Sequence, residues 1–256
     1  MAVLEINKIT MRFGGIVALQ EVSLTVDKGG VVAIIGPNGS GKTTLLNVIT
    51  GVYVPEEGKI LLNGNPIQSL SPEKVCKAGI SRTFQNIRLF KKLTALENVM
   101  VGSHRLYKKG LIDIVLHTNG FKEEQEQNKK KAMELLEFVG LKGKEQMRPE
   151  NLPYASQRLL EIARALASEP QILLLDEPAA GMNKAEIAHL IELIKKLCDT
   201  GLTIMLIEHI MDLVRGVTDK VVVFNYGEKI AEGNYKDIER NPVVIEAYLG
   251  KGAMKC

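Results

Sequence analysis

The chain contains 256 residues, of which 45% are hydrophobic and 25% are charged. This is the composition of a globular protein with a sizeable core, and it excludes disordered, collagen-like and coiled-coil chains. The net charge of +3, from 33 basic and 30 acidic residues, is too close to balance to indicate a nucleic-acid partner.

The first third of the chain predicts strands around a single helix. In residues 1–30 apolar and polar side chains alternate, for example at Val22, Leu24 and Val26, which predicts half-buried antiparallel strands. The uninterrupted apolar run Val31–Ile35 is typical of a fully buried central strand. A helix and a further strand are then expected over residues 43–50 and 58–63.

The middle third has a different pattern. From Leu93 to Ala167 helical periodicity dominates, and residues 128–139 place their apolar side chains on one helix face. The charged run 122–131 is interpreted as a solvated helix face, with a partner-docking role as the alternative. This region therefore predicts an all-helical segment.

Strands and helices alternate again after Gln171, which predicts a parallel α/β sheet. Strands are expected over residues 172–175, 203–207 and 221–224, and helices over residues 184–198 and 210–214. The sequence as a whole predicts an α/β core that contains a helical insert.

Neither a membrane span nor a disulfide framework is expected. No run reaches the roughly 18–20 apolar residues that a transmembrane helix needs, and the N-terminal residues do not have the pattern of a signal peptide. Cys76, Cys198 and Cys256 have no C-x-x-C spacing, so reduced thiols in a cytosolic protein are predicted.

A phosphate-binding loop follows the predicted strand Val31–Ile35. The residues fit G-x-x-x-x-G-K-[ST], in which glycines let successive backbone N–H groups face phosphate oxygens at the start of a helix. Lys42 is expected to reach the β- and γ-phosphates of a nucleotide, and Thr43 to hold Mg²⁺. The motif is Gly36-Pro37-Asn38-Gly39-Ser40-Gly41-Lys42-Thr43-Thr44.

Two acids end a second buried strand. Asp176 and Glu177 follow the apolar run 172–175, and we expect Asp176 to bind in the Mg²⁺ shell. Glu177 is expected near the γ-phosphate, where it can orient or deprotonate an attacking water. This favours hydrolysis over phosphoryl transfer to another substrate. The alternative is an acidic strand end at the surface.

With these motifs in this order, the sequence resembles the ATP-binding subunits of ABC transporters over essentially its whole length. Gln85 matches the glutamine loop, which implies a role at the Mg²⁺ and in catalysis, and His209 matches the switch histidine at the γ-phosphate. Phe13 matches the aromatic residue that stacks on adenine, although a core phenylalanine is an equal alternative.

The resemblance implies a single ABC ATPase domain over residues 1–256. Its fold would be a P-loop NTPase (RecA-like) α/β core with a small antiparallel β-subdomain and an inserted α-helical subdomain. The ATP-binding core with the antiparallel part is expected over 1–85 and 167–256, and the helical subdomain, which carries the signature region, over 86–166.

Three segments are similar to one branch of this family, the Liv-type ATPases of branched-chain amino-acid importers, and in particular to their G-type subunit. They are residues 82–90, 160–166 and 241–250. This similarity implies uptake of branched-chain or related amino acids. Because other proteins bind the cargo, urea import and lipopolysaccharide export stay as alternatives.

Two segments depart from the family pattern. The signature Leu-Ser-Gly-Gly-Gln, which acts on ATP bound to the opposite subunit, aligns with Leu152-Pro153-Tyr154-Ala155-Ser156. Pro153 has neither the hydroxyl nor the N–H of the usual serine. Asn183 stands where many relatives have aspartate. A second ATPase with a standard signature is therefore expected as the partner, in a heterodimer rather than a homodimer.

The resemblance implies an ATPase that binds ATP and Mg²⁺ and powers transport through two membrane permease subunits. A periplasmic or extracellular solute-binding protein would take part indirectly, and the chain would lie peripherally at the cytoplasmic face of the cell membrane. Residues 86–90 are expected to line the groove for a permease helix, with subdomain packing as the alternative. The rival classes are a soluble ABC-type ATPase acting on nucleic acid or ribosomes, and a kinase or GTPase.

Overall fold

The computed structural model describes residues 2–104 and 119–249, which form two compact units. One unit comprises Met1–Arg82 and Gln171–Cys256, and the other comprises Thr83–Pro170. Residues 105–118, which belong to the expected helical region, lie outside the described residues, and so do Gly250 and Cys256.

A six-stranded sheet forms the centre of the first unit, with strand order β10-β9-β3-β8-β7-β6. All neighbours pair in parallel except β10, which is antiparallel to β9. Every residue of β3, β7 and β8 is buried, as expected where both faces of a parallel sheet are covered. The strands are β3 (Val31–Ile35), β6 (Ile80–Arg82), β7 (Ile172–Asp176), β8 (Thr203–Ile207), β9 (Lys220–Asn225) and β10 (Glu228–Gly233).

A four-stranded antiparallel sheet of order β2-β1-β4-β5 completes the strands of this unit. In β2 the side chains of Val22, Leu24 and Val26 are buried, whereas their polar neighbours are more exposed, so the alternation seen in the sequence marks the packed face. The strands are β1 (Ala2–Phe13), β2 (Ile16–Asp27), β4 (Glu57–Leu62) and β5 (Asn65–Pro66).

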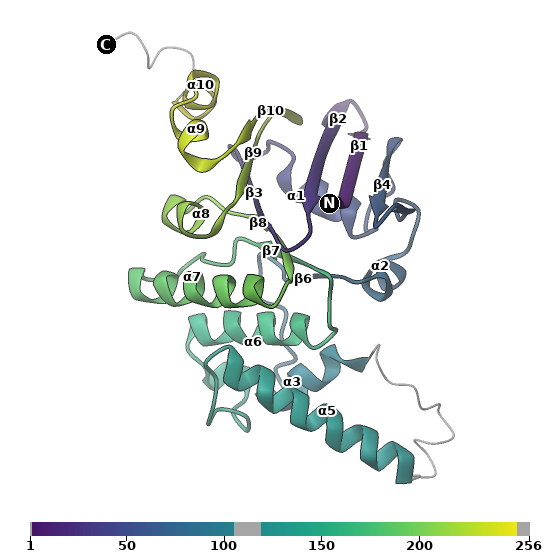
Figure 1. Cartoon of the computed structure of the whole chain (residues 1–256), viewed down its shortest axis with the longest axis vertical. Coiled ribbons are helices and arrows are strands. Elements are labelled where there is room, and N and C mark those ends of the chain that lie inside the picture. Colours follow the sequence, from purple (N-terminus) through teal and green to yellow (C-terminus); the bar gives the residue numbers. More distant parts are fainter. Residues whose placement is uncertain (1, 105–118, 250–256) are drawn as a thin grey trace. The chain divides into compact units, whose positions relative to one another are not determined.

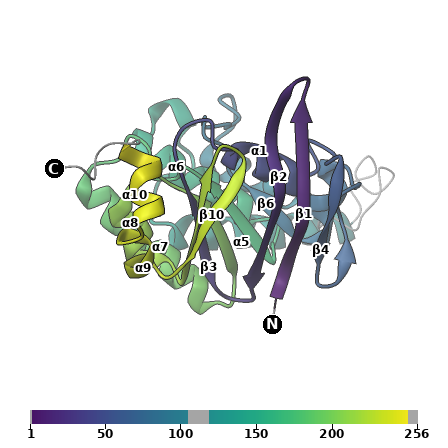
Figure 2. The ribbon, with the colours of Figure 1, turned by 90° about the horizontal axis from the view of Figure 1, so that it is seen from above.

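Helices cover the six-stranded sheet on one face, and the antiparallel sheet lies on the other. Figures 1 and 2 show α7 to α10 on one side of the strands, and α1 with the four-stranded sheet on the opposite side. Apolar side chains from both sheets and from α1 form one continuous core. The helices are α1 (Lys42–Ile49), α2 (Pro72–Ala78), α7 (Lys184–Asp199), α8 (Met211–Val217), α9 (Tyr235–Glu239) and α10 (Pro242–Leu249).

The described part of the second unit is helical. Its elements are α3 (Ala95–Gly102), α5 (Asn119–Phe138), the 3₁₀ turn η2 (Pro149–Asn151) and α6 (Tyr154–Leu166). Leu136, Val99 and Leu160 are fully buried where α5, α3 and α6 pack together. The fold expected from the sequence, an α/β core with an antiparallel β part and a helical insert, is confirmed.

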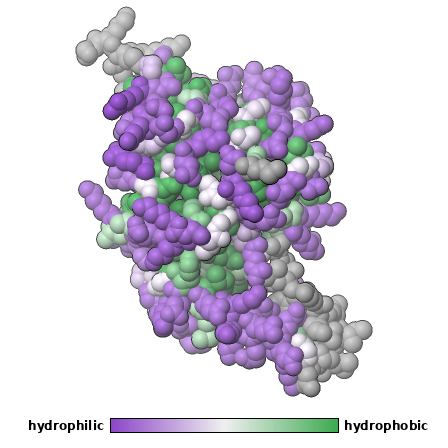
Figure 3. Space-filling view, in the orientation of Figure 1, coloured by the Kyte–Doolittle hydropathy of each residue, from purple (hydrophilic) through white to green (hydrophobic). Residues whose placement is uncertain are grey.

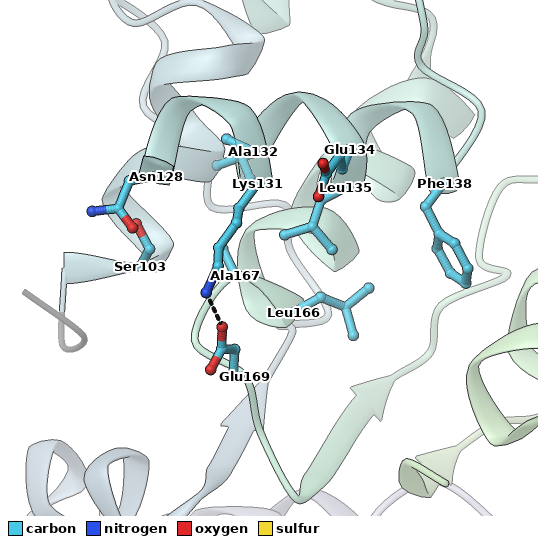
Figure 4. A pocket seen from close by; sticks show the side chains of 11 residues that line it. Ser103, Asn128, Lys131, Ala132, Glu134, Leu135, Phe138, Leu166, Ala167 and Glu169 are labelled. Atoms are coloured by element: carbon cyan, nitrogen blue, oxygen red, sulfur yellow. Dashed lines mark hydrogen bonds and ion pairs between the residues drawn. The ribbon is translucent and has the colours of Figure 1, made fainter. Parts of the chain in front are cut away.

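A cavity of about 310 Å³ lies within the helical unit, between α5 and the end of α6 (Figure 4). Leu135, Phe138 and Leu166 supply apolar walls, and the Lys131 ammonium lies 2.7 Å from the Glu169 carboxylate beside the cavity. None of the residues that line it belongs to a nucleotide-binding motif identified in the sequence.

Polar and charged side chains cover most of the face seen in Figure 3. Across residues 2–104 and 119–249, no helix combines the length and the apolar character needed to cross a membrane. The 20-residue helix α5 is long enough, but it carries the charged run 122–131. Cys76 and Cys198 are both free thiols, and burial raises the pKa of Cys198 to about 11.

Candidate functional site

The loop between β3 and α1 is shaped by glycines that no other residue could replace without displacing its neighbours. Gly36 has a φ of 150°, and a Cβ there would lie 2.1 Å from the carbonyl oxygen of Phe224. Gly41 has a φ of 101° as the N-terminal cap of α1, and a Cβ there would lie 2.5 Å from the carbonyl oxygen of Ala18. The loop is therefore held against β9 and the β2 region, with the N-terminus of α1 at its end.

Lys42 lies inside this loop. Its ammonium donates to the carbonyl oxygens of Gly36 at 2.7 Å and Pro37 at 2.8 Å, and to Ser40 Oγ at 3.4 Å. Burial lowers the pKa of Lys42, while the carboxylates of Glu177 and Asp176 act in the opposite direction. The sequence predicted that Lys42, Asp176 and Glu177 belong to one site. In the structure all three lie in the first unit, where the two carboxylates act on the Lys42 ammonium.

Asp176, at the end of β7, is held by an arginine. Its Oδ2 accepts a hydrogen bond from Arg82 Nη2 at 2.8 Å, and both side chains are almost completely buried. Arg82 Nη1 donates to Asn47 Oδ1 at 2.7 Å, in the helix that begins with Lys42. Arg82 thus connects the carboxylate that follows one strand to the helix that follows another. The sequence analysis gave Arg82 no role.

Glu177 has a backbone conformation that is uncommon for a residue with a side chain, with a φ of 49°. Its N–H donates to the carbonyl of Ile207 at 2.9 Å, which fixes the turn after β7 against the end of β8. His209 follows that strand end, and its Nδ1 lies 3.9 Å from Glu177 Oε2. The two candidate catalytic side chains are therefore neighbours, and backbone strain of this kind concentrates at functional sites.

Glu208 is a second residue whose role the sequence analysis missed. It is only 1% exposed, and its carboxylate accepts hydrogen bonds from the backbone N–H groups of Ala179 at 3.0 Å, His209 at 2.7 Å and Ile210 at 3.1 Å. It thereby ties the turn after Glu177 to the turn that carries His209. An acid directly after the apolar run of β8 was the sequence signal for it.

Two aromatic residues of the first unit bear on the site, one as a predicted adenine contact and the other through a contact with the phosphate loop. Phe13, at the end of β1, is 42% exposed and packs edge-on against Tyr53, with 5.2 Å between ring centroids. Tyr248, in α10, receives a hydrogen bond from the backbone of Gly36; burial raises its pKa and this bond opposes the shift. The sequence analysis did not predict that the C-terminal helix reaches the phosphate loop.

Gln85 and the signature-aligned residues belong to the helical unit. Gln85 is exposed, and its carbonyl oxygen accepts a hydrogen bond from Arg158 of α6. Further along the same loop, the backbone of Phe90 is held by Asn98, whose Oδ1 accepts from Phe90 N at 2.9 Å and whose Nδ2 donates to Phe90 O at 3.1 Å. Asn98 is fully buried in α3.

The signature-aligned residues form the start of α6. Pro153 is the N-terminal cap and makes no side-chain capping bond, and Tyr154 is the first helical residue and 46% exposed. Ala155 follows within the first turn, and the buried Ser156 Oγ accepts from Lys144 Nζ at 3.3 Å. Leu152, just before the cap, is buried.

Asn183 has a clear structural role at the start of α7. Its side-chain oxygen accepts from the N–H groups of Ala185 at 2.9 Å and Glu186 at 3.0 Å. In return, the Glu186 carboxylate accepts a hydrogen bond from the Asn183 N–H at 2.9 Å. Asparagine and aspartate are about equally good helix caps, so this substitution preserves the start of the helix.

The donor set of the first unit fits a nucleotide and a divalent cation. Thr43 is exposed at the start of α1, an eight-residue helix whose first turn contains no acidic side chain, so anions are favoured there. Thr43 hydroxyl and Asp176 carboxylate oxygens are hard ligands suited to Mg²⁺. Thr43 and Asp176 could therefore hold Mg²⁺, and Lys42 could bind the phosphates of the nucleotide.

Comparison with known proteins identifies the family. The ABC transporter family matches residues 19–180, and the family described as "Branched-chain amino acid ATP-binding cassette transporter" matches residues 228–253. The high-affinity branched-chain amino acid transport ATP-binding protein LivG of Escherichia coli K12 is 43% identical over 97% of this chain and 98% of its own.

Solved structures agree. The ADP conformation of an ATP-binding cassette of an ABC transporter superposes with a TM-score of 0.86 at 34% identity, covering 98% of this chain and all of the other. A dimeric post-hydrolysis cassette bound to ADP and phosphate has a TM-score of 0.77 at 28% identity, over 90% of this chain and 98% of the other. The chain belongs to the ABC transporter family of ATP-binding cassettes, in the branch that contains LivG.

Proposed function

We propose that this chain is the ATP-hydrolysing subunit of an importer for branched-chain amino acids. The observation that supports hydrolysis most strongly is the neighbourhood of Lys42, Glu177 and His209 in one unit. The cargo is supported by the likeness to LivG and by the match of residues 228–253. The chain itself supplies the energy-converting step and leaves cargo recognition to other subunits.

Each residue of the site has a chemical role in this proposal. The loop Gly36–Thr44 holds the phosphates with its backbone N–H groups, and Lys42 neutralises the β- and γ-phosphates. Glu177 orients or deprotonates the attacking water, and His209 donates a hydrogen bond toward the γ-phosphate. Phe13 stacks on the adenine, a role that its exposed position allows.

Mg²⁺ would be held by Thr43 and Asp176, and the family resemblance implies Gln85 as a further ligand. The bound cation would neutralise charge on the phosphate oxygens during hydrolysis. Arg82 keeps Asp176 in a fixed orientation by donating a hydrogen bond to its Oδ2 at 2.8 Å.

The partners follow from the same proposal. Two membrane permease subunits receive the motion, and the exposed Phe90 in the segment 86–90 is the side chain we place at that contact. In this chain's own signature, Pro153 lacks the hydroxyl of the usual serine, and Ala155 replaces a glycine that lets the backbone approach ATP closely. A homodimer would present this altered signature to both ATP molecules, so we place a second ATPase with a standard signature at this chain's ATP. A solute-binding protein delivers the cargo, and the chain lies at the cytoplasmic face of the membrane.

Glu177→Gln tests the hydrolytic role. We expect the variant to bind ATP with unchanged affinity and to lose ~100-fold or more in kcat, because a general base contributes about that much. Phosphate release and binding of a fluorescent ATP analogue are the measurements. Glu192→Gln, an exposed change in α7, is the matched control and should keep normal activity. Retention of activity by Glu177→Gln would contradict the proposed function.

The same variant reports on the partner. Glu177→Gln should bind ATP without hydrolysing it, so any ATP-dependent dimer should persist. Light scattering with ATP should detect a monomer for the purified variant alone, and a dimer only after a second ATPase with a standard signature is added. A tight ATP-dependent homodimer of the Glu177→Gln variant would refute the heterodimer.

A further inference from the structure

Arg158 and Glu161 form a buried ion pair one turn apart on α6. Their side chains are 3% and 1% exposed, and Arg158 Nη1 lies 3.2 Å from Glu161 Oε2. A buried ion pair contributes little stability by itself, because desolvation of the two charges offsets their attraction. The contacts that the pair makes with other groups therefore decide what it does.

Arg158 binds two consecutive carbonyl groups of the Gln85 loop. Its Nη1 donates to the carbonyl oxygen of Phe84 at 2.6 Å, and its Nη2 donates to the carbonyl oxygen of Gln85. The same Nη2 lies 3.2 Å from the Tyr154 hydroxyl, in the first turn of α6. One guanidinium thus joins Gln85 to the signature-aligned residues.

Glu161 binds the N–H groups on both sides of Gln85. Its Oε1 accepts from Phe84 N at 3.4 Å and from Arg88 N at 3.3 Å. Burial raises the pKa of Glu161, and these N–H groups together with Arg158 and Arg164 oppose the shift. The two side chains together hold four backbone groups between Phe84 and Arg88, with Gln85 at the centre.

We propose that Arg158 and Glu161 are positioning residues that join the Gln85 loop and the start of α6 into one rigid piece. A displacement of Gln85 would then move Tyr154 and the residues beside it, so that the Gln85 loop and the surface offered to the partner's ATP change together. The inference deepens the proposed function and rests on it, because Gln85 acts on nucleotide only if the chain is an ATPase.

The test uses the full chain in the transporter complex isolated from membranes. Arg158→Met combined with Glu161→Leu replaces the pair with apolar side chains of similar volume, so that neither charge is left buried without its partner. Arg158→Lys keeps the charge beside Glu161 but has a single nitrogen for all its partners. Lys131→Met, which breaks the exposed Lys131–Glu169 pair of the same unit, is the control (Figure 4).

We expect the double variant to lose some Tm, because four backbone groups lose their hydrogen-bond partners. Its affinity for ATP should not change, because Lys42 and the phosphate loop lie in the other unit. Its kcat should fall by about 10-fold or more, as small displacements of a positioned group do. Arg158→Lys should lie between the double variant and the wild type, and Lys131→Met should match the wild type. Amide hydrogen exchange at Phe84 and Arg88 should be faster in the double variant.

A double-mutant cycle with Gln85→Ala separates positioning from a merely structural role. If Arg158 acts through Gln85, Arg158→Lys should cause no further loss of kcat in the Gln85→Ala background. Losses of kcat that multiply in the Gln85→Ala background, or an unchanged kcat in the double variant, would overturn the proposal. So would a kcat that falls only in proportion to the fall in Tm in both variants that change Arg158. Normal hydrolysis by Glu177→Gln would instead refute the proposed function itself.

Discussion

At the scale of single residues, roles that depend on neighbours in the chain could be predicted from the sequence, and roles that depend on distant partners could not. The phosphate loop and the pair Asp176-Glu177 could be predicted, because their chemistry depends on neighbours in the chain. Arg82 could not be assigned from the sequence, since its partner Asp176 is 94 positions away. Glu208 was equally hidden, because its contact with Ala179 appears only after β7 and β8 pair.

Glu208→Ala should destabilise the first unit. The change leaves the buried N–H of Ala179 without its acceptor and removes the acceptor of two further N–H groups, which costs ~1–3 kcal/mol or more in free energy of unfolding. Glu208→Gln, which keeps one side-chain oxygen, should lose less. Urea denaturation followed by circular dichroism measures both, with the exposed change Glu192→Ala as control. Equal stability of Glu208→Ala and the wild type would contradict the role given to this carboxylate.

At the scale of elements, hydrophobic pattern predicted the buried strands well and helix ends less well. Residues 31–35 and 203–207 coincide with β3 and β8, because a run that is apolar on both faces has one clear interpretation. Helix α5 spans Asn119–Phe138 and so contains both the charged run 122–131, interpreted as a solvated helix face, and the apolar face from residue 128. Its start at Asn119 was not predicted, because the residues before 122 give no packing pattern. The cap at Asn183 appeared in the sequence only as a departure from the family.

A prediction at the start of α7 tests whether Asn183 is explained by helix capping. Asn183→Ala removes a capping oxygen that accepts two N–H groups and should lower the free energy of unfolding by ~1 kcal/mol. Asn183→Asp restores the residue common in relatives and should leave stability nearly unchanged, since both side chains cap equally well. Chemical denaturation of both variants is the measurement. A larger loss for Asn183→Asp than for Asn183→Ala would show that capping does not explain this residue.

At the scale of the whole molecule, the sequence predicted an α/β core and a helical insert, but not the order of the strands in the sheet. The order β10-β9-β3-β8-β7-β6 places β3 between strands that come about 170 residues or more later in the chain, and no local pattern encodes such pairings. The helical insert was visible because β-branched runs vanish between Leu93 and Ala167. The role of Gln85 depends on a bound nucleotide, and that of residues 152–156 on a second subunit, so both remain predictions.

The measurement that tests the central claim most directly is uptake of radiolabelled leucine by cells that lack the gene for this chain. Cells complemented with the wild type or with Glu192→Gln should recover uptake, and cells complemented with Glu177→Gln should not, although the variant protein is present at the membrane in equal amount. Uptake of lysine should be the same in all strains. Leucine uptake that is unaffected by loss of the gene, or that Glu177→Gln restores, would contradict the account.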